Sequence, residues 1–216
     1  DDSLHRRLDP YWKPFGLLGF DRDGDPIFWE RIGIIDVDAF GRMPHDFVVR
    51  HEAYNFARLL QAMEELSRAV DRPVVYFTAV EDLTGLGLHM LAPRGLVNYK
   101  TIVRICEEEY PELVKRALVI KAPGVFEKVW RFVSRFFDDG TREKIQFIRE
   151  ADTLATLSKY IAPEWIPECY GGRLRLGSSS ECEPVLYCSQ PRRVPEELMQ
   201  EILATWGEVT SSTCRS

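Results

Sequence analysis

Hydrophobic and polar residues form two alternating patterns along this chain. Over 44–70, apolar residues recur at the spacing of one helix face, which predicts a long amphipathic helix. The run 73-PVVYFTAVED-82 is nearly continuous in apolar residues and is typical of a strand covered on both faces. The same two patterns return as a predicted helix over 96–110, which Pro111 ends, and a predicted strand over 117–123. Strands that alternate with helices predict parallel pairing and a layered α/β domain.

Further elements are predicted on either side of this centre. Residues 15–33 predict two short strands joined by a turn at 23–24, where Asp-Gly supplies a residue tolerant of positive φ. Beyond the second buried strand, the pattern predicts an amphipathic helix over 124–137, a strand over 144–150 and a helix over 152–161. The alternation of strand and helix therefore continues to about residue 161.

The predicted helix over 124–137 has an unusually aromatic face. At 100° per residue, its apolar side chains fall within an arc of roughly 160°. They are Val125, Phe126, Val129, Trp130, Phe132, Val133, Phe136 and Phe137. Burying five aromatic side chains stabilises a protein by about 8–15 kcal/mol, so this face has to be covered. It either packs on the sheet as an ordinary core helix or closes an apolar cavity that holds a lipid.

Lys144, a short distance further on, fits no local rule. Thr141 is able to cap a helical turn, but a capping box wants Glu or Gln three residues later, where Lys144 stands. A cation at a helix start also opposes the helix dipole. Lys144 therefore either begins the next strand with its ammonium in water or binds a partner anion, and local rules do not decide between them.

Composition and charge narrow the class of protein. The 216 residues suffice for one large domain, and 45% hydrophobic with 29% charged residues is an ordinary globular balance. A net charge of −6 argues against nucleic acid as the main partner. No apolar run approaches the roughly 18 residues that a membrane span needs. We expect a cytoplasmic protein, because the five cysteines are odd in number and form no C-x-x-C pair.

No motif for metal binding or catalysis is complete. The spacing of Cys169, Cys182 and Cys188 matches no common zinc pattern. The acidic turn that begins at Asp21 lacks the glycine and glutamate of a calcium loop. The sequence also lacks a nucleophile elbow, a P-loop lysine and the third glycine of a dinucleotide fingerprint. The four histidines are scattered and show no metal-ligand pairing. We expect one of them, His51, at the surface or at its boundary. We therefore predict no enzyme activity, no cofactor and no metal.

Five segments, taken together in this order, resemble one known family. They are 23-DGDPIFWERIG-33, 82-DLTGLGLHML-91, 110-YPELVKRALVIKAPGVF-126, 138-DDGTREKI-145 and 161-IAPEWIPECYGG-172. From about Pro10 to Gly172 the chain resembles the CRAL-TRIO lipid-binding domain, in particular the animal branch that contains supernatant protein factor (tocopherol-associated protein). The resemblance implies a mostly parallel sheet as the floor of a hydrophobic lipid pocket, flanked by helices and closed by a mobile gate helix.

On that resemblance the helix over 124–137 occupies the gate position. The basic side chains on its flank, Lys128, Arg131 and Arg135, would meet anionic headgroups when the gate opens at a membrane, or else form the solvated side of an amphipathic helix. The residues expected to line the pocket or gate are Phe28, Tyr76, His89, Phe126, Val129, Trp130 and Val133. For His89 the alternative is that it caps the turn at the end of the strand.

The resemblance also implies a headgroup site. The phosphatidylinositol-binding members of the family use a glutamate after Tyr-Pro, a threonine and a lysine, and those positions hold Glu112, Thr141 and Lys144. A lysine and a hydroxyl are able to bind a phosphate while the carboxylate holds the lysine, although Glu112 and Lys144 also read as a structural ion pair. The family's phosphatidylcholine-type site looks lost at Gly87 and His89, which favours an isoprenoid such as a tocopherol or squalene as the second ligand.

These expectations define the predicted organisation and role. Residues 1–176 form the CRAL-TRIO domain and 177–216 a C-terminal extension with a short helix over 195–206, while the family's N-terminal helical segment is absent from the sequence. We expect a monomer that binds one lipid and transfers it between membranes, with a transient membrane surface as its partner. The alternative is a lipid sensor or scaffold without transfer, which recruits a protein partner through a surface such as Glu107-Glu108-Glu109.

Overall fold

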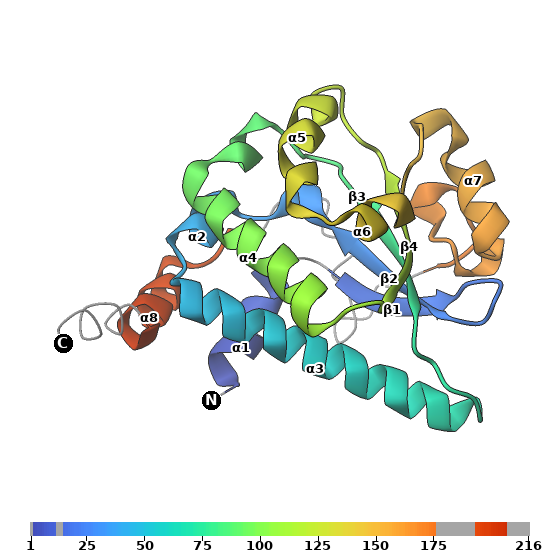
Figure 1. The fold of residues 1–216 in the computed structure, drawn as a ribbon, viewed down its shortest axis with the longest axis horizontal. Coiled ribbons are helices and arrows are strands. Elements are labelled where there is room, and N and C mark those ends of the chain that lie inside the picture. The colour runs from blue at the N-terminus through green and yellow to red at the C-terminus, as the bar shows by residue number, and fades with distance from the viewer. Residues whose placement is uncertain (1, 12–14, 176–192, 207–216) are drawn as a thin grey trace.

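The computed structural model describes residues 2–11, 15–175 and 193–206, which fold around one five-stranded sheet. Figure 1 shows this sheet with the helices around it. The strands lie in the order in which they follow along the chain. They are β1 (Phe15–Phe20), β2 (Pro26–Arg31), β3 (Phe77–Asp82), β4 (Val114–Ile120) and β5 (Ile145–Phe147). The pair β1 and β2 is antiparallel, and every later pair is parallel. The predicted α/β fold with a mostly parallel sheet is confirmed.

The helices follow the predicted alternation with shifted ends. The α-helices are α1 (Ser3–Leu8), α2 (Val37–Arg42), α3 (His45–Ala69), α4 (Pro93–Glu109), α5 (Phe126–Val133), α6 (Asp139–Lys144), α7 (Thr153–Tyr160) and α8 (Glu196–Trp206). Short 3-10 turns are η1 (Asp9–Tyr11), η2 (Ile32–Ile34), η3 (Leu88–Leu91), η4 (Ser134–Phe136), η5 (Glu150–Asp152), η6 (Pro163–Trp165) and η7 (Glu168–Tyr170). The predicted helix over 124–137 thus divides into α5 and η4. None of the described helices is long and apolar enough to cross a membrane.

The two faces of the sheet carry different layers, because successive side chains of a strand point to opposite sides. Trp29 faces α7 and the segment 161–170, and it lies in a core with Leu118 and Leu157 that is fully buried. Phe28, its neighbour, faces the opposite side and packs in a cluster with Leu59 of α3. Helices α3, α4, α5 and α6 lie on that second side (Figure 1).

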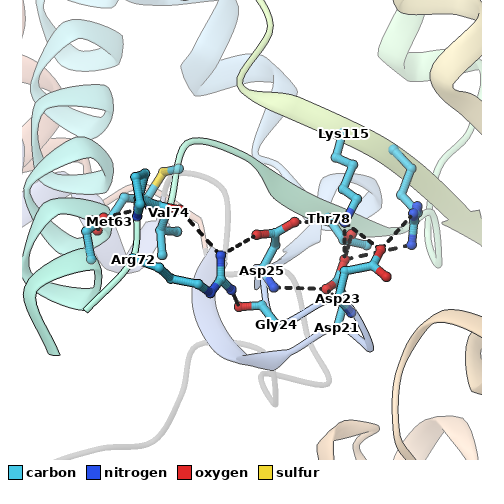
Figure 2. Close-up of polar contacts among 12 residues, drawn as sticks. Asp21, Asp23, Gly24, Asp25, Met63, Arg72, Val74, Thr78 and Lys115 are labelled. Carbon is cyan, nitrogen blue, oxygen red and sulfur yellow. Dashed lines mark hydrogen bonds and ion pairs between the residues drawn. The ribbon is translucent and has the colours of Figure 1, made fainter. Parts of the chain in front are cut away.

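The hairpin turn between β1 and β2 is held by polar side chains of β3, of β4 and of the segment before β3 (Figure 2). Lys115 Nζ on β4 lies 2.6 Å from Asp23 Oδ2 and 2.7 Å from Asp25 Oδ2. Thr78 Oγ1 on β3 donates to Asp21 Oδ2 at 2.8 Å, and Arg72 donates to the Gly24 carbonyl. Hydrogen bonding to Lys115 holds the pKa of Asp23 below its usual range. These carboxylates therefore neutralise basic side chains at one end of the sheet, and the turn itself is the predicted hairpin.

A second core joins the two ends of the described chain. Leu4 and Leu8 of α1 pack with Phe47 of α3 and with Met199 and Ile202 of α8. The helix predicted over 195–206 is confirmed as α8, and it is buried against the rest of the domain rather than projecting from it. Residues 177–192 of the predicted extension, with Cys182 and Cys188, and residues 207–216 lie outside the described residues.

His51 corrects one expectation of the sequence. It is 0% exposed, not at the surface, because its face of α3 turns towards α1. His51 Nδ1 lies 3.2 Å from Nδ1 of His5, and His5 stacks on Phe47 with ring centroids 5.0 Å apart. The periodicity of α3 places position 51 on the same face as Phe47, which is four residues earlier, and that signal was available in the sequence.

Two predicted strands are shorter in the structure. β3 begins at Phe77 instead of residue 73, and β5 ends at Phe147. Residues 139–144 form α6, and its N-cap is Asp138, whose Oδ1 accepts from Thr141 N at 2.6 Å. Lys144 is therefore the last residue of a helix, where a cation favours the helix dipole. The conflict that it posed in the sequence arose from placing the helix start at Thr141.

Candidate functional site

A cavity of about 510 Å³ lies between the sheet and the helices of its second side. Its floor includes Phe28, Ala79 and Ala117 from the three central strands. Its walls come from α3 and α4, and α5 and α6 complete the enclosure. Most lining side chains are aliphatic or aromatic, as expected of a site for an apolar ligand.

Helix α5 covers one side of this cavity with part of its aromatic face. Val129 is 4% exposed and packs in a cluster with Leu83 and Val119. The rings of Phe126 and Trp130 lie 5.0 Å and 4.8 Å from the ring of Phe147 on β5. Val129 is the one buried residue among those described in α5, so the helix covers the cavity with few deeply buried side chains.

The remaining side chains of α5 and η4 face outwards. Phe132 is 42% exposed, although the helical periodicity counts it with the apolar arc. Lys128, Arg131 and Arg135 are exposed as expected, and within the described part of the chain they form no ion pair. The outer surface of the helix is therefore basic with an exposed aromatic ring.

The predicted headgroup residues come together at the rim of the cavity. Lys144 Nζ at the end of α6 donates to Glu112 Oε2 at 2.8 Å, and both residues line the cavity together with Thr141. The Glu112 side chain is 78% exposed and that of Lys144 is 27% exposed. Glu112 has a positive φ of 65°, which is uncommon for a residue with a side chain. The rim is thus open to water and holds one ion pair beside a hydroxyl.

The predicted lining residues divide into two groups. Phe28, Phe126, Val129, Trp130 and Val133 line the cavity. Tyr76 and His89 do not: Tyr76 is 44% exposed in the segment before β3, and His89 is exposed on η3. The prediction for Tyr76 failed because the strand was expected to begin at 73, which gave residue 76 a place in the sheet that it does not have.

Sequence reasoning missed a group of polar residues on the cavity wall. Glu30 and Glu81 are neighbours in the register of β2 and β3, and Glu52 and Asn55 lie one turn apart on α3. All four line the cavity, and Glu30, Glu52 and Asn55 are at most 8% exposed. The signal was their position on the apolar face of each element: Asn55 lies four residues before Leu59, and Glu30 two residues after Phe28.

Helix α4, which forms part of the cavity wall, is hydrogen-bonded to the N-cap residue of α6. Glu107, one of three consecutive glutamates at the end of α4, accepts from the backbone N–H of Asp138 through Oε1 at 2.8 Å. This residue also lines the cavity. One member of the acidic run therefore has a structural contact, while Glu108 lies 3.8 Å from Arg104 on the same helix.

Comparison with known proteins shows similarity over most of the chain. The model of the CRAL/TRIO domain matches residues 12–172. The protein real-time of Drosophila melanogaster is 31% identical over 162 residues, which cover 74% of this chain and 25% of that protein. Protein real-time of Aedes aegypti is 31% identical over 163 residues, again 74% of this chain and 25% of the relative. The chain thus spans about a quarter of the length of these curated relatives.

A solved structure has the same fold. The crystal structure of Sfh5 superposes with a TM-score of 0.56 over 87% of this chain and 70% of the other, at 21% identity. The relatives bear the name protein real-time, so the branch with supernatant protein factor stays a prediction.

Proposed function

The chain belongs to the CRAL/TRIO domain family, and from this premise we propose that it binds a single lipid in the cavity and transfers it between membranes. Membership of the family supports lipid binding in general. The observation that carries the proposal is the cavity of about 510 Å³ with apolar walls, which one amphipathic helix covers. An apolar space of this kind fits the hydrocarbon part of a lipid, because moving hydrocarbon out of water lowers the free energy.

Two lipid classes fit different parts of the site. The rim formed by Glu112, Thr141 and Lys144 suits a phosphorylated headgroup such as that of phosphatidylinositol: the ammonium and hydroxyl donate to the phosphate, and the carboxylate holds the ammonium in place. The apolar lining suits a neutral isoprenoid such as a tocopherol or squalene, for which the rim would be a structural ion pair.

The proposed mechanism is extraction without a covalent step. Helix α5 and the η4 turn meet a membrane through Lys128, Arg131 and Arg135, each of which contributes about 1 kcal/mol beside anionic headgroups. Phe132, exposed among them, enters the interface. The helix then moves aside, so that Phe126 and Trp130 contact the lipid that enters the cavity, and it closes again. The protein is proposed to reside in the cytoplasm and to contact membranes transiently.

Transfer between vesicles tests this proposal. Donor vesicles carry fluorescent phosphatidylinositol or a fluorescent isoprenoid with a quencher, and the rise in fluorescence reports movement to acceptor vesicles. We expect catalytic transfer that requires anionic lipid and falls when Arg131 and Arg135 are replaced by glutamine. Replacing Arg149, an exposed arginine outside α5, by glutamine is the matched control. Binding of lipid without net transfer would favour the sensor or scaffold, and lipid turnover would identify an enzyme instead.

A further inference from the structure

One amide on the wall of the cavity has no hydrogen-bond partner among the residues that the structure describes. Asn55 on α3 is 8% exposed and lines the cavity. Neither its Oδ1 nor its Nδ2 has a hydrogen bond to any residue that the structure describes. Buried side-chain amides of folded proteins are almost always hydrogen-bonded, because burial removes their water. Oδ1 and Nδ2 of Asn55 therefore indicate that a ligand bound in the cavity supplies a polar group to them.

The neighbours of Asn55 make this wall different from the rest of the cavity. Glu30, Glu52 and Glu81 also line it, and each takes part in an interaction. Asn55 is the neutral member of the group, and within the described part of the chain its donor and its acceptor are both unused. The rim is the opposite case, since its polar atoms pair with each other and the Glu112 side chain is 78% exposed.

The hydrogen-bonding chemistry of the Asn55 amide indicates which ligand group is able to bind it. Its NH₂ group needs an acceptor, and its carbonyl oxygen needs a donor. A fully ionised phosphate only accepts, an ammonium only donates, and a hydrocarbon does neither. A hydroxyl group does both, and it adds no charge to a wall that already carries carboxyl groups. The apolar remainder of the cavity then accommodates the hydrocarbon body to which the hydroxyl is attached.

We propose that Asn55 binds the hydroxyl group of a lipid alcohol held inside the cavity and thereby selects alcohols over hydrocarbons and ethers. This inference rests on the proposed lipid binding and narrows its neutral ligands: an isoprenoid with a free hydroxyl fits, and squalene, which has none, does not. Asn55 acts as a specificity-determining residue, and the rim ion pair has no part in this contact.

The test compares an alcohol with its own methyl ether. The full chain is incubated with phosphatidylcholine vesicles that contain geranylgeraniol, geranylgeranyl methyl ether or phosphatidylinositol, and retained lipid is measured by mass spectrometry after gel filtration. We expect wild type to retain about tenfold more alcohol than ether, because the ether oxygen accepts from Asn55 but has no O–H to donate to Asn55 Oδ1, which is then buried without a partner. In Asn55→Leu the two should be retained equally. Gln61→Leu, the same change on the exposed face of α3, should keep the wild-type preference.

A second readout separates this role from a structural one. If Asn55 serves a ligand, the lipid-free Asn55→Leu protein should melt a few degrees higher than wild type, because an unsatisfied amide has been removed. A structural asparagine would give a lower melting temperature. If Asn55→Leu does not fold, Asn55→Ala, which needs no additional space, provides the same alcohol-to-ether comparison.

The outcomes distinguish the two proposals. Equal retention of alcohol and ether by wild type, an undiminished preference in Asn55→Leu, or retention of phosphatidylinositol alone would overturn the role of Asn55 and leave lipid binding standing. Retention of no lipid by wild type would overturn the proposed function itself, and with it this inference.

Discussion

The two faces of the central strands are built from alternate residues of the same short sequences, yet one face is a packed core and the other borders a cavity. On the packed face, Val80, Leu118 and Ile120 are 0% exposed and contact α7 and the segment after it. On the cavity face, the adjacent positions are Ala79 and Ala117. The small side chains of Ala79 and Ala117, at the centre of the floor, leave space that larger residues would fill. Residue size at these two positions therefore contributes to the cavity.

The largest expected effect on stability comes from truncating a large side chain on the packed face of the sheet. Leu118→Ala should lower the free energy of unfolding by about 2–5 kcal/mol, because it leaves a hole among residues that cannot relax. Urea denaturation measures the loss. A change below about 1 kcal/mol would mean that this face is as loosely packed as the other.

A pH titration extends the comparison to the core between α1 and α3. Burial lowers the pKa of His5 from its ordinary value of 6.5. The folded state therefore favours the neutral ring, and its contribution to stability is complete above pH 6.5 and declines as pH falls from there towards the lowered pKa. The urea midpoint should fall with pH in this window, and less so in His5→Phe. An identical pH dependence in both proteins would exclude His5 as the cause.

Filling the cavity should have a smaller effect on stability than emptying the core. Ala117→Leu should change the free energy of unfolding by less than about 1.5 kcal/mol, because the added methyl groups enter existing space. The same variant should retain at least about tenfold less lipid, since it takes volume from the ligand. Mass spectrometry of retained lipid and urea denaturation check the two effects. A large destabilisation would show that the floor is already filled.

The rim should contribute least to stability. Lys144→Ala removes an ion pair whose carboxylate side chain is 78% exposed, and such pairs stabilise proteins by about 0–1 kcal/mol. Thermal unfolding should hardly change, whereas retention of phosphatidylinositol should fall if the rim binds its headgroup. Retention that stays at the wild-type level would reduce Lys144 and Glu112 to a structural pair. Arg142→Ala, on the same helix, is the control.

Much of the fold was predictable because its signals are local. The alternation of buried strands and amphipathic helices depends on the spacing of apolar residues, and β2, β3, β4, α3 and α4 appear close to where that spacing puts them. The ends were less predictable, since hydrogen bonds decide them. Asp138, not Thr141, caps α6, and this single difference changes Lys144 from an anomaly into a favourable helix end.

The site was only partly predictable because it depends on which side of an element faces the cavity. The residues of α5 that line it follow from helical periodicity, and Glu112 and Lys144 came from the family resemblance. Asn55 was not predicted as a site residue, because a single polar residue on an apolar helix face does not change the prediction made from the hydrophobic pattern. Only the three-dimensional arrangement shows that this exception borders a cavity.

The anchoring of α6 bears on the order of events when a lipid enters. Asp138 is fixed to Glu107 of α4, and Lys144 runs directly into β5, where Ile145 pairs with Ala117. Movement confined to 121–137 would therefore carry α5 away and leave Glu112, Thr141 and Lys144 where they are. A lipid headgroup would then contact these three residues, already in their binding positions, before α5 closes over the cavity. Recognition would then precede enclosure, and a poorly matched lipid would be able to leave before the helix closes over it.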